Sequence, residues 1–199
     1  MNAAMRIGVL STCLLAGAAA LGVDPPAPPQ TVEQVCKLTV CRPATEIKLN
    51  MGQGRYYVID QPMAPYTYDG VINVIANETV AINAKTKDDK ILDFNYVPDA
   101  GKATPVIVTR LQQYVDSKGQ NSMLLSVTNP FDRPLVYTAT IQPAGKKQFQ
   151  PTSICPVQAH RVGEETWPYP LVQVLLKDFR FLAKDEAIDK DCLAAVPAQ

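Results

Sequence analysis

The sequence predicts an all-β protein, an antiparallel β-sandwich of about eight to ten strands. Short apolar segments recur at intervals of roughly ten residues, and clusters of turn-forming residues separate them. Several segments alternate apolar and polar side chains, which is typical of strands with one buried and one exposed face. Sustained helical periodicity is weak. These observations favour two packed sheets over a helical or mixed fold.

The expected strands follow one another with recognisable turns between them. Their predicted ranges are residues 45–51, 54–60, 70–76, 79–85, 91–97, 105–115, 122–129 and 134–142. Alternation is clearest at 79–85 and 134–142. The connecting sequences KTKDDK, PDAGKATP, DSKGQN and NPFDRP are rich in residues that form turns.

The last part of the chain allows two interpretations. Residues 171–183 show both the alternation of a strand and apolar residues at helical spacing. We expect a last strand through about Phe181, followed by a short helix or turn over residues 183–192. The number and spacing of the strands resemble the immunoglobulin-like class of sandwich that many exported proteins use, and this resemblance is one of pattern alone.

The first residues predict export. Arg6 precedes an apolar run over residues 7–21, and a proline-rich polar stretch follows it. This is the layout of a cleavable signal peptide, here residues 1–22, with cleavage after Gly22 or in the neighbouring register after Ala20. An uncleaved membrane anchor is one alternative, although the run is short for one. Lipidation at Cys13 is the other. We expect a periplasmic or secreted protein of a bacterium.

Composition limits the partners. The chain has 19 Lys and Arg and 19 Asp and Glu, and removal of residues 1–22 takes away only Arg6 among them, so the net charge becomes about −1. A near-neutral chain without a basic run gives no surface for nucleic acid or anionic lipid. We therefore expect no nucleic acid partner and no stable membrane insertion after cleavage. The remaining chain divides into a flexible proline-rich spacer at 23–35 and a single sandwich domain at 36–199.

Four cysteines follow the predicted cleavage site: Cys36, Cys41, Cys155 and Cys192. An even number of cysteines in an exported chain indicates disulfides. Four cysteines allow three pairings, of which we favour Cys36–Cys41 and Cys155–Cys192. The first would close a tight loop, and the second would tie the C-terminal tail to residues 152–170. Redox exchange and metal binding are the alternatives, although no Cys-x-x-Cys spacing is present.

The sequence contains no recognisable catalytic constellation or cofactor motif. Its single histidine, His160, is accompanied by no Gly-x-Ser-x-Gly elbow, and no glycine-rich phosphate loop occurs. The acidic clusters are interleaved with lysine, as on a solvated surface. A copper site built from His160 with Met51, Met63 and Met123 is an alternative to ordinary packing of these methionines. We expect no enzymatic activity, no cofactor and no metal.

Two aromatic segments are candidate contact surfaces. Residues 55–70 hold four tyrosines, of which Tyr66 and Tyr68 are candidate partner contacts. The structural alternative is that these tyrosines cover one end of the sandwich. Trp167 and Tyr169 are the corresponding candidates in the second segment.

The second segment, residues 152–170, contains the only tryptophan, the only histidine and Cys155. Pro168 and Pro170, which directly follow Trp167 and Tyr169, restrict the backbone, so a structural anchor between the two sheets is the first interpretation and a recognition loop the second.

Together these features predict a non-enzymatic binding or accessory module of the bacterial envelope. It would recognise another envelope or secreted protein through the aromatic loops or through an open sheet edge. A periplasmic chaperone for surface or secretion-system subunits is one alternative, and a copper carrier is another.

Overall fold

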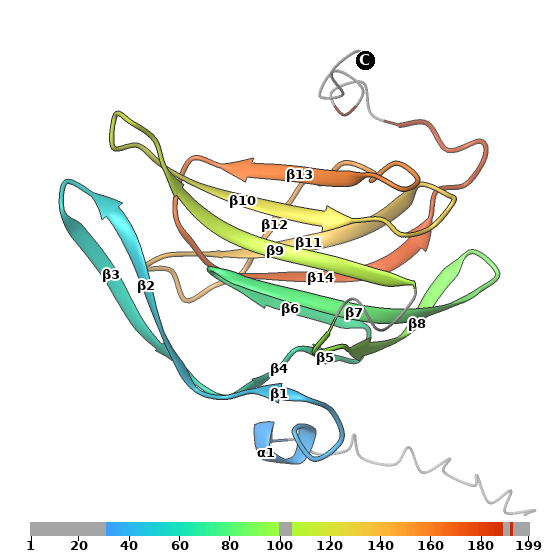
Figure 1. Ribbon diagram of the computed structural model, residues 1–199, viewed down its shortest axis with the longest axis horizontal. Helices are drawn as coiled ribbons and strands as arrows, with labels where there is room; N and C mark the ends of the chain where they lie inside the picture. The colour runs from blue at the N-terminus through green and yellow to red at the C-terminus, as the bar shows by residue number, and fades with distance from the viewer. Residues whose placement is uncertain (1–30, 100–104, 189–191, 193–199) are drawn as a thin grey trace, which may run out of the picture.

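A computed structural model describes residues 31–99, 105–188 and 192 (Figure 1). The predicted signal peptide and residues 23–30 of the predicted spacer lie outside these residues. The described chain is nearly all β, and its strands pair antiparallel throughout. The prediction of an all-β antiparallel sandwich is therefore confirmed, while the immunoglobulin-like assignment stays a prediction.

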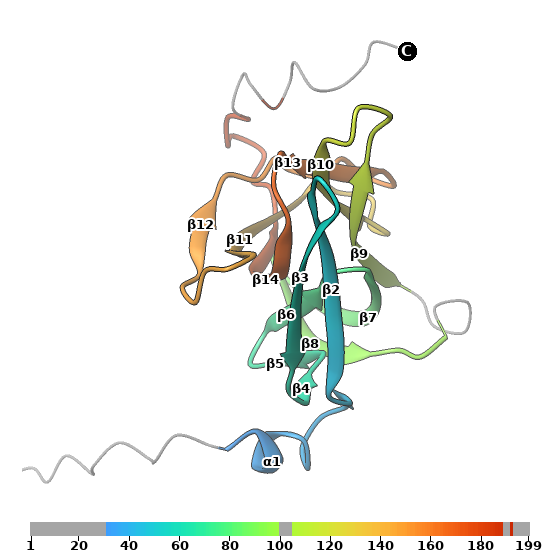
Figure 2. The same cartoon turned by 90° about the vertical axis from the view of Figure 1, so that its left-hand side faces the viewer.

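Ten strands form one large curled sheet. Its order is β12-β11-β14-β8-β7-β9-β10-β13, with β6 beside β14 and β5 beside β6. The strands are β5 (Thr67–Tyr68), β6 (Val71–Ile75), β7 (Glu78–Lys87), β8 (Lys90–Tyr96), β9 (Val106–Val115), β10 (Asn121–Thr128), β11 (Leu135–Pro143), β12 (Gln150–Thr152), β13 (Val162–Trp167) and β14 (Leu171–Phe181). Seen from the side, β11, β12 and β14 lie opposite β9 and β10 (Figure 2).

The core lies between these two layers. Alternate residues of β10 and β11 are buried, as the period of two predicts for strands that cover a core with one face. Leu111, Met123, Leu125 and Leu176 are fully buried within the cluster. Burial of such side chains stabilises the fold by about 1.5–3 kcal/mol each relative to exposure.

A separate two-stranded sheet lies across one side of the sandwich. It consists of β2 (Thr45–Gly52) and β3 (Arg55–Gln61), which form the long hairpin on the left of Figure 1. The turn has positive φ at Gln53 (54°) and Gly54 (72°), as a two-residue primed turn requires. Ile47 is buried on the inner face of the hairpin, so β2 is fixed against the body of the protein.

Nine of the observed strands match predicted ranges, and others were not predicted. The segment that contains Trp167 was expected to be a loop, but Val162–Trp167 forms the edge strand β13, paired with β10. Its glutamates lie on a strand with one open side, where charge is tolerated because it discourages further pairing. The predicted spacer is also too long, because Val32–Val35 form a short helix, α1, with a capping box between Thr31 and Gln34.

Two disulfides are present, Cys36–Cys41 and Cys155–Cys192, which is the pairing favoured from the sequence. After Phe181 the chain makes a turn at residues 184–185. Within the described ranges, no helix combines the length and apolarity that a bilayer crossing requires.

Candidate functional site

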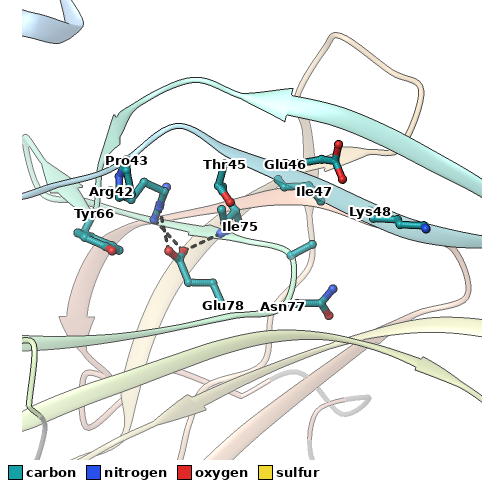
Figure 3. Close-up of a pocket in the computed structure, with 11 residues that line it drawn as sticks. Arg42, Pro43, Thr45, Glu46, Ile47, Lys48, Tyr66, Ile75, Asn77 and Glu78 are labelled. Carbon is teal, nitrogen blue, oxygen red and sulfur yellow. Dashed lines mark hydrogen bonds and ion pairs between the residues drawn. The ribbon is translucent and has the colours of Figure 1, made fainter.

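The candidate site is a cleft beneath the β2–β3 hairpin. Its volume is about 350 Å³, near the lower end of the range for ligand pockets. One wall is the first half of β2 and the other is the β6–β7 turn at residues 75–78. Arg42 and Tyr66 lie at one end of the cleft, and Lys48 and Asn77 lie at the other (Figure 3).

Arg42 is the most unusual residue of the cleft because it is charged and only 2% exposed. Its Nε donates to Glu78 Oε1 at 2.9 Å, and its Nη2 lies 2.8 Å from Glu78 Oε2. Nη2 also donates to the backbone oxygen of Asn73 at 2.6 Å. The guanidinium therefore uses one full edge for a bidentate ion pair, which is the strongest geometry for this pairing.

The third nitrogen of the guanidinium has no partner. Nη1 of Arg42 is buried and makes no hydrogen bond within the described part of the chain. Buried donors are nearly always satisfied, because an unmet donor costs about 1–3 kcal/mol. Because Arg42 lines the cleft, an acceptor bound there is the simplest way to satisfy Nη1.

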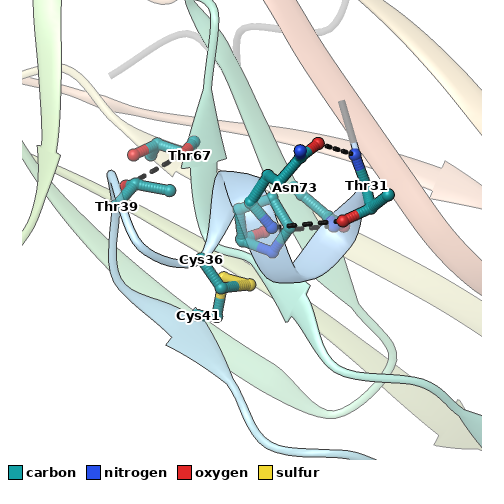
Figure 4. The surroundings of a disulfide bond; sticks show 8 residues. Thr31, Cys36, Thr39, Cys41, Thr67 and Asn73 are labelled. Atoms are coloured by element: carbon teal, nitrogen blue, oxygen red, sulfur yellow. Dashed lines mark hydrogen bonds between the residues drawn. A yellow bond between two sulfur atoms is a disulfide. The ribbon is translucent and has the colours of Figure 1, made fainter. Parts of the chain in front are cut away.

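Several contacts fix the backbone around Arg42. The residue belongs to β1 (Cys41–Arg42), which pairs with β4 (Ala64–Pro65). The Cys36–Cys41 disulfide ties β1 to the end of α1, and Thr39 Oγ1 donates to the Thr67 oxygen at 3.1 Å (Figure 4). The rigid surroundings hold the guanidinium in place before any ligand arrives.

A buried polar network supports the site from below. Asn73 Nδ2 donates to the Pro65 oxygen at 3.3 Å, and Gln173 Nε2 donates to Asn73 Oδ1 at 2.6 Å. Asn73 lies on β6 and Gln173 on β14, so the network links the cleft to the main sheet. Such networks specify one arrangement of the core when their members are satisfied.

Tyr66 covers the guanidinium. Its ring centroid lies 4.7 Å from Arg42 Cζ and 3.9 Å from the ring of Tyr96, with the two rings almost parallel. Burial and the neighbouring hydroxyl of Tyr96 raise the pKa of Tyr66 above its ordinary value, so Tyr66 stays a neutral phenol at physiological pH. The ring adds a cation–π contact to the ion pair.

Burial also raises the pKa of Glu78, even though the Arg42 charge and the Ile75 N–H lower it. Glu78 Oε2 accepts the Ile75 N–H at 3.1 Å. The removal of this carboxylate from water therefore outweighs its ion pair, as is common for buried pairs.

The outer edge of β2 forms the second functional element of the cleft. Asn50 on β2 donates its backbone N–H to Gln113 Oε1 and accepts from Gln113 Nε2, both at 2.8 Å. The backbone groups of Asn50 thus point away from β3. Because strands alternate with a period of two, the N–H and C=O groups of Lys48 and Glu46 point the same way, toward the cleft.

No hydrogen bond within the described residues occupies those groups of Lys48 and Glu46. Gln113 lies beside the Lys48 end of the cleft, and its own N–H donates to Asn77 Oδ1 at 3.1 Å. The cleft therefore has an open strand edge on one side and the Arg42 guanidinium at one end.

The sequence-predicted contact residues occupy different positions. Tyr66 belongs to the cleft, while Tyr68 at the end of β5 is 40% exposed. Trp167 is 7% exposed, and its Nε1 donates to Thr152 Oγ1 at 3.2 Å. Tyr169 is 40% exposed. The burial of Trp167 favours the structural interpretation of its segment.

His160 is an exposed turn residue with φ of 55°, and its N–H donates to the Phe131 oxygen. Among the described residues, no three His, Cys, Asp or Glu side chains gather as a metal site would require.

Sequence reasoning singled out one residue of the cleft, Tyr66, and missed Arg42 and Glu78. Arg42 directly follows a disulfide cysteine, and such a position fixes a backbone firmly. No local pattern in the sequence indicates that Arg42 and Glu78 meet.

Comparison with known proteins adds no relative: no protein-family model, no curated protein and no solved structure matches this chain.

Proposed function

We propose that the protein is a non-enzymatic binding module, exported to the bacterial envelope or beyond, that binds an extended segment of another protein along the outer edge of β2. Two disulfides support export, because they persist in oxidising compartments. The added segment would lie in the cleft and pair with β2 through backbone hydrogen bonds. This mode of recognition recurs wherever a sheet offers an open edge.

The observation that carries this proposal is the amide clamp between Gln113 and Asn50. The clamp is an amide group seated in the plane of β2 on its outer side, with both a donor and an acceptor engaged at 2.8 Å. It therefore occupies the position of one peptide unit of a neighbouring strand. The next outward groups, on Lys48 and Glu46, face the cleft, where a polypeptide could continue the pattern.

The experiment starts from purified protein with both disulfides intact. The protein is immobilised and exposed to a library of short synthetic peptides acetylated and amidated at their ends. Enriched peptides are identified by mass spectrometry, and the dissociation constant of the best one is measured by fluorescence anisotropy. Failure to enrich any peptide overturns the proposal.

Two matched variants locate the binding edge. Lys48→Pro removes an outward N–H of β2, and Val58→Pro removes an outward N–H of β3 at the paired position. Proline is tolerated where a strand N–H faces outward. Lys48→Pro should weaken peptide binding by about tenfold, whereas Val58→Pro should leave it unchanged. Thermal unfolding checks that both variants are folded. If both folded variants lose the same amount of peptide affinity, the peptide binds somewhere other than the edge of β2.

A further inference from the structure

We infer that the end of the cleft at Arg42 receives an uncharged backbone carbonyl of the bound segment. The cleft would therefore select an internal stretch of polypeptide over a chain end that carries a free carboxylate. This inference rests on the proposed function and specifies the chemical class of its ligand.

The donor is Nη1 of Arg42. It is buried, it has no acceptor among the described residues, and it belongs to a side chain that lines the cleft. The other two nitrogens are engaged with Glu78 and Asn73 at 2.6–2.9 Å. No oxygen of the described residues completes this guanidinium, and we assign that place to an acceptor on the bound segment.

The charge of Arg42 is already neutralised. Glu78 takes the Nε and Nη2 edge, and both oxygens of its carboxylate are engaged. The other charged residues that line the cleft are Glu46 and Lys48, which are of opposite sign. The cleft as a whole thus has no net charge with which to attract an anion.

A carboxylate placed at Nη1 would share one guanidinium with Glu78. Two carboxylates at one site repel each other, and the incoming one would lose its hydration without gaining an unpaired cation. A carbonyl oxygen needs only the hydrogen bond, and its desolvation costs less. The geometry and the charge balance both favour the neutral acceptor.

The span of the cleft agrees with an extended segment. The β2 residues that line the cleft run from Thr45 to Lys48, three residue steps or about 10 Å at the rise of a strand. A few residues of an added strand fill this length. The segment then passes from the Lys48 end toward Arg42, where one of its carbonyl groups meets Nη1.

The test uses the peptide that the library selects. Its C-terminus is shortened one residue at a time, and each length is made both as the amide and as the free acid. At the length that brings the terminus to Arg42, the free acid should bind the wild-type protein about tenfold more weakly than the amide. The inference would be overturned if the free acid and the amide bound with equal affinity at every length, or if the free acid bound more tightly.

Glu78→Gln and Glu164→Gln form a matched pair that tests the cause. Glu78→Gln leaves the guanidinium charge unpaired, so the preference for the amide should disappear or reverse. Glu164→Gln removes an exposed carboxylate from β13, outside the cleft, and should leave the preference unchanged. If both variants keep the wild-type preference, Arg42 does not contact the terminus and the inference fails.

The two proposals fail in different ways. If no peptide binds, the proposed function is wrong. If a peptide binds and its affinity depends on the Lys48 N–H, but the acid and the amide bind equally well, only the inference about Arg42 is wrong. Because the wild-type comparison needs no variant, the test does not depend on whether Glu78→Gln folds.

Discussion

The Arg42 cleft and the Trp167 segment are both well fixed, yet they differ in how completely their polar groups are satisfied. Trp167 is buried, its N–H is bonded to Thr152, and Glu165 accepts the Cys155 N–H at 2.8 Å nearby. Arg42 is equally buried, but one of its nitrogens has no acceptor in the described chain. Rare residues thus belong to a structural anchor in one region, while in the other an unmet buried donor is the feature on which the proposed binding site rests.

The largest expected effect is a loss of stability on substitution of Trp167. Trp167→Ala removes a core side chain and should lower the free energy of unfolding by about 3–5 kcal/mol. The affinity for the selected peptide should not change, because the indole does not line the cleft. Urea denaturation and anisotropy measure the two quantities. Tyr169→Ala is the control. Because Tyr169 is 40% exposed, this substitution should lower the free energy of unfolding much less. A loss of peptide affinity in folded Trp167→Ala would contradict the division.

The two disulfides should also differ in their effects on stability and on peptide binding. Replacing Cys155 and Cys192 with serine should cost about 4 kcal/mol of unfolding free energy, since the closed loop is long, and should spare the peptide affinity. Replacing Cys36 and Cys41 should cost only about 2 kcal/mol. The second pair should nevertheless weaken peptide binding, because Cys41 directly precedes Arg42. If the variant that loses more unfolding free energy also loses more peptide affinity, the two regions do not differ in the way described.

Sequence patterns predicted the strands because the signals that specify them are local. The tight connection after β10 is an example: NPFDRP was predicted to form a turn, and within it Asn129 Nδ2 donates to the Arg133 oxygen at 2.8 Å. The edge strand β13 was missed because its exposed glutamates weaken the apolar pattern. Helix α1 was missed because four residues are too few to show a periodicity.

The cleft could not be read from the sequence for a different reason. Arg42 and Glu78 are 36 positions apart, and the Asn50–Gln113 clamp joins residues 63 apart. Each residue by itself has an ordinary sequence environment. Their meeting depends on the hairpin crossing one side of the sandwich, which no local pattern encodes.

The smallest expected effect is a pH dependence that distinguishes Glu78 from the carboxylates of the surface. Burial raises the pKa of Glu78 in the folded protein above the ordinary value of 4.5, so the folded state binds this proton more readily than the unfolded state. The contribution of Glu78 to the free energy of unfolding is therefore fully present below about pH 4.5 and is lost as the pH rises through the raised pKa.

The measurement that isolates this contribution is urea unfolding of the wild type and of Glu78→Gln across this pH range. The unfolding free energy of the wild type minus that of the variant should fall as the pH rises. The other groups that face Glu78 are Arg42, which remains charged, and Tyr66, whose pKa is raised from 10, so neither titrates in this window. A difference that instead grows with pH would show that the ion pair outweighs burial.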